Sequence, residues 1–227
     1  MSGKIEGRNP VTEAIKSGRP IEKILIEKGS HGLQGIVDLA RERGITLQFA
    51  ENTRAKQGVA AVVAAHEYAD IADILSDASF VIVLDSICDP QNLGSILRTA
   101  NAAGADGIII PKRNAVGLTE TVSIVSAGAV EYTKVAKVPN IAALLDDLKA
   151  RGFWIYGADM EGSAYYEEKF DGKVALVIGS EGDGISNLVK KKCDFLIRIP
   201  MLGKIESLNA SVAAGILMYE IVRQRRK

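Results

Sequence analysis

The sequence has few of the residues that build disulfide frameworks and metal clusters. Its 227 residues include two cysteines, Cys88 and Cys193, and two histidines. Two cysteines cannot form a disulfide framework, and two histidines beside them do not make a credible zinc site. We therefore expect no metal, and a reducing compartment, the cytoplasm.

Long hydrophobic runs and a net charge are also missing. No apolar run approaches the roughly 18 residues that span a bilayer, and the first nine residues lack the apolar core of a signal peptide. The 28 basic and 28 acidic residues cancel, which argues against bulk electrostatic capture of nucleic acid. Residues 1–66 nevertheless carry a net charge of +3, and the remainder carries −3. We expect a protein with no membrane partner.

Residues 1–66 alternate between strand and helix patterns. Ile21–Glu27 is typical of a strand, and apolar residues at 33, 36, 37 and 40 have the spacing of an amphipathic helix. The alternation at 45, 47 and 49 and the apolar run Gly58–Ala65 indicate two more strands. These patterns predict a small α/β domain over residues 1–66. The polar, acidic stretch 67–79 is predicted to be a linker with a short helical pattern at 71, 74 and 75.

From Phe80 onward, continuous apolar strands alternate with helical stretches. The expected strands are Phe80–Leu84, Gly107–Ile110, Thr133–Lys137, Phe153–Tyr156, Val174–Ile178 and Phe195–Ile199, and the clearest helices are Ile141–Lys149 and 208–223. Strands without polar alternation are buried on both faces, which predicts a mostly parallel sheet covered by helices. Residues 80–227 thus form a second α/β domain, whose ligand is expected outside the carboxyl ends of the strands.

The loop at 85–100, after the first of these strands, carries an asparagine and an arginine. Asn92 and Arg98 are six residues apart, and Gly94 and Ser95 are predicted to open a helix between them. The free N–H groups at the start of a helix and the planar guanidinium of an arginine can both bind phosphate or carboxylate. An asparagine in a turn and an unrelated surface arginine are the alternative.

The loop at 179–186 is rich in glycine. Gly179, Gly182 and Gly184 do not have the spacing of a dinucleotide fingerprint, and no P-loop lysine follows, so a nicotinamide-dependent enzyme has little support. A tight turn explains the glycines. Glu181 is harder to explain this way, because a turn does not require a carboxylate.

The third loop, 199–214, leads into the last predicted helix. Ser207 is a candidate N-cap, with Asn209 in the first turn. Small residues continue along this helix at Ala210, Ala213 and Ala214. They permit close packing against another helix, within the chain or in a partner.

Taken together, the three loops resemble the motifs of the SpoU/TrmH branch of the SPOUT methyltransferases. The matching segments are N-L-G-S-I-L-R-T-A at 92–100, L-V-I-G-S-E-G-D-G-I at 176–185 and I-P-M-L-G-K-I-E-S-L-N-A-S-V-A at 199–213. The resemblance covers about residues 80–226. It implies a deep C-terminal trefoil knot, whereas the pattern alone predicts an unknotted sheet.

The resemblance also implies an activity. It is the transfer of a methyl group from S-adenosyl-L-methionine to a ribose 2′-hydroxyl of RNA, without a metal, by a homodimer that packs through the face Ala210, Ala213, Ala214 and Leu217. The implied catalytic residues are Asn92, Arg98, Glu181, Ser207 and Asn209, and the implied cofactor-binding residues are Gly179, Ile199 and Leu208. Arg98 is expected at the mouth of the cofactor pocket, meeting Glu181. It acts there as a general base or as an electrostatic stabiliser, and we favour the second because a guanidinium stays protonated in proteins.

The N-terminal segment Ile5–Ile15 resembles the substrate domain of the bacterial 23S rRNA guanosine 2′-O-methyltransferases (RlmB type), which has an L30e-like, RNA-binding fold. The usual longer loop ending in H-Q-G is here shortened to E-N-T-R-A-K-Q-G at 51–58, with Lys56 in place of histidine. The expected RNA-binding residues are Arg41, Arg43, Arg54 and Lys56.

These resemblances predict methylation of a guanosine in 23S rRNA. One alternative is a tRNA guanosine 2′-O-methyltransferase of the same family. Another is a catalytically silent RNA-binding relative, against which the intact set of motif residues argues.

Overall fold

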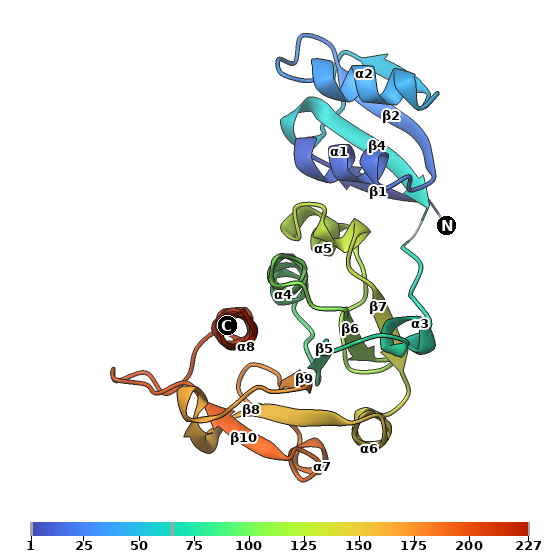
Figure 1. Cartoon of the computed structure of the whole chain (residues 1–227). Coiled ribbons are helices and arrows are strands. Elements are labelled where there is room, and N and C mark those ends of the chain that lie inside the picture. The colour runs from blue at the N-terminus through green and yellow to red at the C-terminus, as the bar shows by residue number, and fades with distance from the viewer. Residues whose placement is uncertain (1, 65, 227) are drawn as a thin grey trace. The chain divides into compact units, whose positions relative to one another are not determined.

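The computed structural model describes residues 2–64 and 66–226. The chain divides into two compact units (Figure 1). The N-terminal unit comprises Met1–Glu67 and Leu118–Tyr132, and the C-terminal unit comprises Tyr68–Gly117 and Thr133–Lys227. Within the described residues, no helix combines the length and the apolar character needed to cross a membrane.

The N-terminal unit is built on a four-stranded mixed sheet in the order β1-β4-β2-β3. Its strands are β1 (Ser2–Glu6), β2 (Ile21–Glu27), β3 (Leu47–Ala50) and β4 (Val59–Ala64), and its first two helices are α1 (Arg8–Lys16) and α2 (Gln34–Glu42). β2 and β3 are parallel, whereas β4 is antiparallel to both β1 and β2. The buried faces of α1, α2 and the sheet form one apolar core.

Residues 118–132, inside the range predicted for the C-terminal domain, pack in the N-terminal unit. They form α5 (Glu120–Val125) and the 3₁₀ turn η2 (Ala129–Glu131). Arg19 Nη1 donates to Glu131 Oε1 at 2.9 Å and lies 2.7 Å from His66 Nε2. All three side chains are at most 10% exposed. Burial and the adjacent Arg19 lower the pKa of His66 to about 4, so the ring is neutral and Nε2 accepts from Arg19.

The C-terminal unit contains a six-stranded sheet in the order β10-β8-β9-β5-β6-β7. The strands are β5 (Phe80–Leu84), β6 (Gly107–Pro111), β7 (Val135–Val138), β8 (Phe153–Ala164), β9 (Lys173–Ile178) and β10 (Phe195–Arg198). Every neighbouring pair is parallel, which confirms the predicted parallel sheet. β5 is buried along its whole length, as its continuous apolar sequence predicts.

Helices cover both faces of this sheet (Figure 1). They are α3 (Ile71–Leu75), α4 (Pro90–Ala103), α6 (Ile141–Ala150), α7 (Asn187–Lys190) and α8 (Ala210–Arg225). α3, α6 and α7 bury their apolar residues in one core cluster with the strands. α4 packs against α8 on the other face. The helix that carries the first motif, at 92–100, is therefore a neighbour of the helix that follows the third motif loop.

Residues 67–79, predicted as a linker, contain α3, as the short helical pattern indicates. Ile74 and Leu75 are buried in the core of the C-terminal unit, and the Ala69 N–H bonds to the carbonyl of Val135. Asp70 caps the helix by accepting from the Ala72 N–H.

The prediction that Gly94 and Ser95 open a helix is wrong. α4 begins at Pro90, with Asp89 as its N-cap, so both residues lie in the helix interior. An aspartate cap followed by proline at the first helical position is a strong start signal.

Candidate active site

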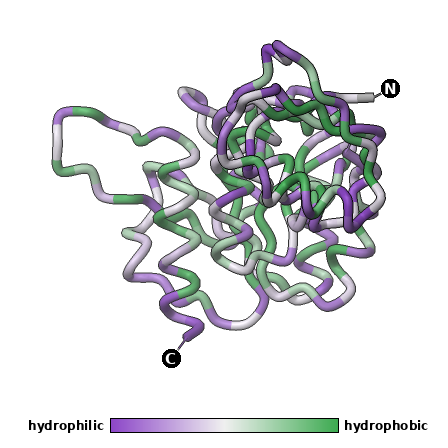
Figure 2. The backbone as a smooth tube through the Cα atoms, turned by 90° about the horizontal axis from the view of Figure 1, so that it is seen from above, coloured by the Kyte–Doolittle hydropathy of each residue, from purple (hydrophilic) through white to green (hydrophobic). Residues whose placement is uncertain are grey.

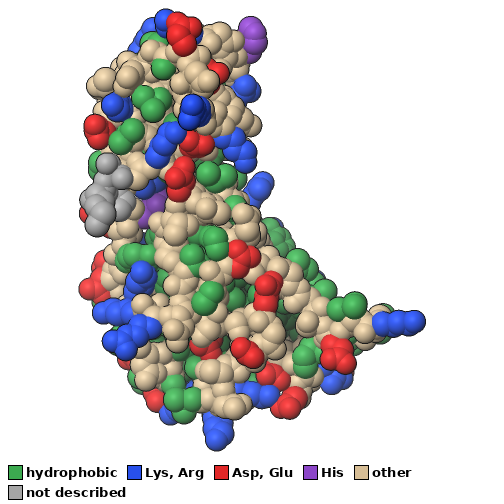
Figure 3. Space-filling model, turned by 180° about the vertical axis from the view of Figure 1, so that it is seen from behind, with side chains coloured by type: hydrophobic (Ala, Val, Ile, Leu, Met, Phe, Trp, Pro, Cys, Tyr) green, Lys and Arg blue, Asp and Glu red, His purple; other side chains and the backbone are tan. Residues whose placement is uncertain are grey.

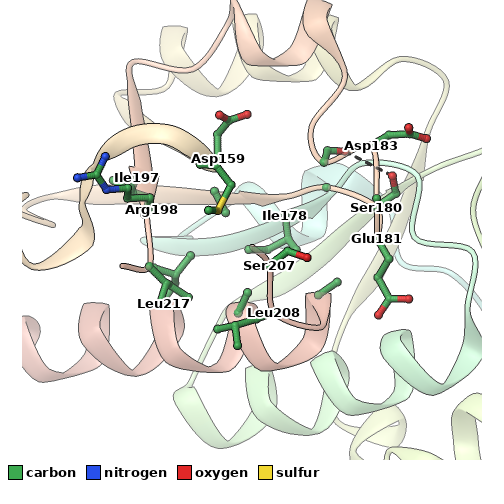
Figure 4. Close-up of a pocket in the computed structure, with 18 of the residues that line it drawn as sticks. Asp159, Ile178, Ser180, Glu181, Asp183, Ile197, Arg198, Ser207, Leu208 and Leu217 are labelled. Carbon is green, nitrogen blue, oxygen red and sulfur yellow. Dashed lines mark hydrogen bonds between the residues drawn. The ribbon is translucent and has the colours of Figure 1, made fainter. Parts of the chain in front are cut away.

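A cavity of about 580 Å³ lies in the C-terminal unit, at the carboxyl ends of β9 and β10 and beside the middle of β8. Its walls come from residues 158–161, 178–184 and 197–201 and from 207–217 at the start of α8. Figure 4 shows side chains from these segments, among them Ile178, Ser207 and Leu208, gathered around one space. All its lining residues belong to one unit, so the motif loops at 179–186 and 199–214 are brought together within it.

The glycine loop after β9 is a closed turn. Ser180 and Gly184 exchange backbone hydrogen bonds of 3.0 and 3.1 Å. A Cβ on Gly179 would lie 2.0 Å from the carbonyl carbon of Gly184, so only glycine fits there. Gly182 and Gly184 have φ values of +94° and +66°, a conformation that favours glycine. The turn presents Glu181 on the cavity wall.

Asp85 anchors this loop from the neighbouring strand. It follows β5, is 6% exposed, and its Oδ2 accepts from the Ser186 N–H at 2.8 Å. Asp85 lies outside the three family motifs, although a carboxylate directly after a buried strand is a recognisable sequence signal.

Asn209 connects all three motif loops. Its Oδ1 accepts from the N–H groups of Ser211 and Val212, which makes it the N-cap of α8. Its Nδ2 donates to Asn92 Oδ1 at 2.9 Å and to Glu181 Oε1. Asn209 therefore fixes the position of the Glu181 carboxylate relative to α4. The N-cap expected at Ser207 belongs to Asn209 instead.

Charged side chains line another part of the cavity. Lys190 Nζ lies 3.0 Å from Asp159 Oδ1 and 2.5 Å from Glu161 Oε2. The hydrogen bonds from Lys190 to Glu161 and then to Asp159 raise the pKa of the lysine, so it stays charged. Arg198 and Asp183 also line the cavity. No group of His, Cys, Asp and Glu in residues 2–64 and 66–226 is arranged to hold a metal ion.

Most, but not all, of the predicted site residues reach this cavity. Those that line it are Gly179, Glu181, Ile199, Ser207, Leu208 and Asn209. Asn92 is buried behind the wall, 4% exposed, and is linked to it through Asn209. Arg98 is exposed on α4 and is not among the lining residues, and its expected position at the mouth of the cofactor pocket stays a prediction.

The helix face predicted to form the dimer is already buried within the chain or lines the cavity. Ala210, Ala214 and Leu217 are at most 6% exposed, and Ala213 lines the cavity. The prediction that this face packs in a dimer is therefore wrong. Small residues let α8 approach its own sheet and α4 closely.

The four basic residues predicted to bind RNA are exposed in the N-terminal unit, at two ends of β3. Arg41 and Arg43 end α2 and precede the strand, whereas Arg54 and Lys56 follow it.

Two family models match the sequence. The model of the SpoU rRNA Methylase family matches residues 79–219. The chain belongs to the SpoU rRNA methylase family. It is therefore an RNA methyltransferase. The second model, described as RNA 2′-O ribose methyltransferase substrate binding, matches residues 4–69.

Known members of the family resemble the whole chain. The TrmH family protein YacO of Bacillus subtilis (strain 168) is 48% identical over 236 residues, which cover 96% of this chain and 94% of YacO. The SpoU methyltransferase AviRb from Streptomyces viridochromogenes, crystallised with AdoMet, has a TM-score of 0.86 at 28% identity and covers 99% of this chain and 91% of its own. The AdoMet-bound rRNA methyltransferase from Sinorhizobium meliloti has a TM-score of 0.80 at 26% identity, covering 98% and 87%. These likenesses confirm the α/β fold of the SpoU family.

Proposed function

We propose that this SpoU-family protein transfers a methyl group from S-adenosylmethionine to a ribose 2′-hydroxyl of RNA. The observation that carries the proposal is the hydrogen-bonded connection from Glu181 through Asn209 to Asn92, beside a cavity of nucleoside size. The match of residues 4–69 to a ribose methyltransferase substrate-binding model supports RNA as the acceptor.

The residues around the cavity fit S-adenosylmethionine. About 580 Å³ is within the usual range for small-molecule sites. Ile178, Ile197 and Leu208 offer apolar surface for a flat base, and the backbone of the loops at 179 and 199 offers donors and acceptors. The Glu181 carboxylate suits a cationic ligand. When bound, the sulfonium supplies an already activated methyl group, and Gly179, Ile199 and Leu208 hold the molecule.

The polar residues beside the cavity orient the acceptor. Asn209 is fixed as a helix cap, so the Glu181 carboxylate it bonds is held with little freedom. Asn92 and Ser207 complete the polar group around the ribose hydroxyl. Because methyl transfer needs the attacking oxygen in line with the breaking bond, this positioning accounts for a large share of the rate acceleration.

We assign Arg98 to the RNA side of the reaction. Six residues separate it from Asn92 on α4, which turns it about 120° around the helix away from the Asn92 side chain. Its exposed guanidinium is free to grip phosphate and ribose oxygens of a bound RNA. As the 2′-oxygen takes the methyl group and its proton passes to solvent, Arg98 would stabilise the negative charge that develops on the oxygen and remain protonated itself.

The substrate we propose is a guanosine of 23S rRNA, and the alternative is a tRNA guanosine. The separate RNA-binding unit supports the ribosomal substrate, as do relatives such as the rRNA methyltransferase from Sinorhizobium meliloti. Mapping of 2′-O-methyl groups on RNA from cells with and without the gene tests this. Loss of one methyl group from 23S rRNA is expected, and loss from a tRNA would favour the alternative. No loss, with weak S-adenosylmethionine binding by calorimetry, would identify a silent relative.

We further propose that the protein is a homodimer. The loop between β10 and α8 projects from the C-terminal unit and carries apolar side chains (Figures 2 and 3). Leu202 is 100% exposed and Ile205 72%, and Val212 and Tyr219 on α8 are about half exposed. Apolar surface of this kind is typical of an interface. Light scattering showing a monomer at micromolar concentration would contradict the dimer.

The C-terminal trefoil knot is also a proposal, made on the family resemblance. The hydrogen bond from Asn209 to Glu181 supports it, as does the cavity that residues 179–184 line together with residues 207–217, because both place the C-terminal stretch beside the glycine loop.

A further inference from the structure

A wide bulge interrupts β8 beside the cavity. The register between the two strands jumps from Gly157 to Ser163 on β8 while β10 advances by one residue, and the pairing of β8 with β9 ends at Gly157. In the described chain, residues 158–162 therefore have no partner in either neighbouring strand. We call these residues the β8 bulge. Bulges next to active sites often redirect side chains, and residues 158–161 line this cavity.

The two ends of the β8 bulge are closely packed, whereas its middle is open to solvent. A Cβ on Gly162 would lie 2.3 Å from the carbonyl carbon of Leu196, and a Cβ on Gly157 would lie 2.7 Å from Cys193 Sγ. Between these ends, Met160 is 51% exposed. The middle of the bulge is not buried, so a fixed position there depends on polar contacts.

Lys190 makes such contacts with two carboxylates of the bulge. Its Nζ lies 3.0 Å from Asp159 Oδ1 and 2.5 Å from Glu161 Oε2. Asp159 Oδ1 also accepts from the Glu161 N–H at 2.9 Å, and this local turn presents both carboxylates to the lysine. The Lys190 and Asp159 side chains are 23% and 15% exposed. A partly buried network of three charges is stronger than an isolated surface ion pair.

Lys190 itself comes from the glycine-loop side of the cavity. It is the last residue of α7, which follows the glycine loop directly, and its N–H bonds to the carbonyl of Ser186 at 2.8 Å. The glycine loop and the β8 bulge both line the cavity, and Figure 4 shows Asp159 well apart from Glu181. Lys190 therefore connects two parts of the cavity wall that come from different strands.

We propose that Lys190 is a positioning residue for the cofactor, which holds the β8 bulge in place so that Ala158 and Met160 contact the adenosine part of S-adenosylmethionine. The inference rests on the proposed function in that the cavity binds this cofactor. The adenosine part fits because Ala158 and Met160 are apolar and a methionine side chain adapts to a flat surface. Lys190 is already paired with two carboxylates, so it is poorly suited to bind the carboxylate of the amino-acid part directly.

Three variants of the full-length protein test the proposal. Lys190→Met removes the charge and keeps an apolar stem, whereas Lys190→Arg keeps the charge. Lys192→Met is the matched control, because Lys192 also follows α7 and forms an ion pair, with Asp146 of α6 at 2.8 Å, but does not line the cavity. Thermal melting checks that all three variants fold.

Calorimetry measures binding of S-adenosylmethionine, S-adenosylhomocysteine and 5′-methylthioadenosine, the last of which lacks the amino-acid part. Lys190→Met should raise the Kd of all three ligands by about three- to tenfold. Lys190→Arg and Lys192→Met should keep the wild-type Kd. The single-turnover methylation rate of Lys190→Met at saturating cofactor should stay within about twofold of wild type, because only binding is weakened.

Hydrogen–deuterium exchange of the protein without ligands tests whether Lys190 holds the bulge. The amides of residues 158–162 should exchange faster in Lys190→Met than in wild type. The amides of residues 153–157, in the paired part of β8, should exchange at the wild-type rate. Lys192→Met should match the wild type in both segments.

Weaker binding of S-adenosylmethionine and S-adenosylhomocysteine with unchanged binding of 5′-methylthioadenosine would overturn the proposal, since Lys190 would then contact the amino-acid part. Equal losses in Lys190→Met and Lys192→Met, or an unchanged Kd in Lys190→Met, would also overturn it. Failure of the proposed function is a different outcome. A wild-type protein that binds none of the three ligands would refute that function, and the exchange rates would still decide whether Lys190 holds the bulge.

Discussion

Asn209 donates a hydrogen bond of 2.9 Å to Asn92, although 117 residues separate them in the sequence. The same amide group donates to Glu181, and the amide oxygen caps α8. One side chain thus serves both helix stability and the geometry of the candidate catalytic group. A substitution that keeps the capping of α8 but removes the donation to Glu181 therefore distinguishes the effect on stability from the effect on methyl transfer.

Asn209→Asp keeps the capping oxygen but loses the amide donor and places a carboxylate against Glu181. Methyl transfer should fall by at least about 10²-fold, as for other lost preorganised donors. Asn209→Ala loses both roles and should also lower the free energy of unfolding by about 1 kcal/mol. Thermal melting and single-turnover methylation distinguish the variants. Wild-type turnover in the aspartate variant would show that the amide donor is dispensable.

Arg98→Ala should leave S-adenosylmethionine affinity within a few-fold, because Arg98 does not line the cavity. Methyl transfer should fall by about 10²–10³-fold. Arg98→Lys should restore little, since an ammonium lacks the planar fork. Calorimetry and single-turnover kinetics measure the two effects. Arg151→Ala, an exposed arginine after α6, is the control. Normal turnover in the Arg98→Ala variant would refute the assigned role.

Gly179→Ala should weaken cofactor binding by roughly 5- to 160-fold. The added methyl group collides with the backbone of Gly184, so the glycine loop must move, at a cost of about 1–3 kcal/mol. Gly203→Ala is the matched control, because a Cβ there has no atom within 4 Å and Gly203 lies in the neighbouring loop. Calorimetry with S-adenosylmethionine should give a Kd raised by roughly 5- to 160-fold for the first variant and a normal Kd for the second. Equal affinities would mean that the loop adapts.

Stability should fall as the pH drops from about 6.5 to about 4 because of His66. Its pKa in the folded state, about 4, is below the 6.5 of an unperturbed histidine, so the unfolded chain binds the extra proton in this range. The loss is about 2 kcal/mol, discounted for solvent screening. His66→Gln keeps an acceptor for Arg19 but does not titrate.

Urea denaturation of wild type and His66→Gln at pH 7 and pH 4.5 isolates this contribution, since Glu131 and the other carboxylates titrate in both proteins. The wild type should lose more stability than the variant. Parallel losses would show that His66 is not held neutral.

The sequence predicts the C-terminal sheet well because strands such as β5 are continuously apolar and buried on both faces. β1 and α1 were not predicted, since residues 2–16 alternate polar and apolar residues over lengths too short for a clear period. The placement of residues 118–132 depends on the contact of Glu131 with Arg19, which no local pattern contains.

The motif residues of the cavity could be predicted, but their connections could not. Asn209 and Ser207 are two residues apart, and only the observed backbone shows which one caps α8. The exposure of Arg98 also needed the structure, because the motif spacing alone does not say which face of α4 packs on the sheet.

The last helix supplies one wall of the cavity, and residues 118–132 complete the N-terminal unit. The apolar core of the N-terminal unit lies within residues 5–63, so during synthesis this core forms before residues 118–132 leave the ribosome. The cofactor cavity instead waits for α8, because that helix supplies one of its walls. A bound cofactor therefore cannot stabilise the nascent C-terminal unit until α8 has emerged. A chain arrested before α8 should show no protection by the cofactor.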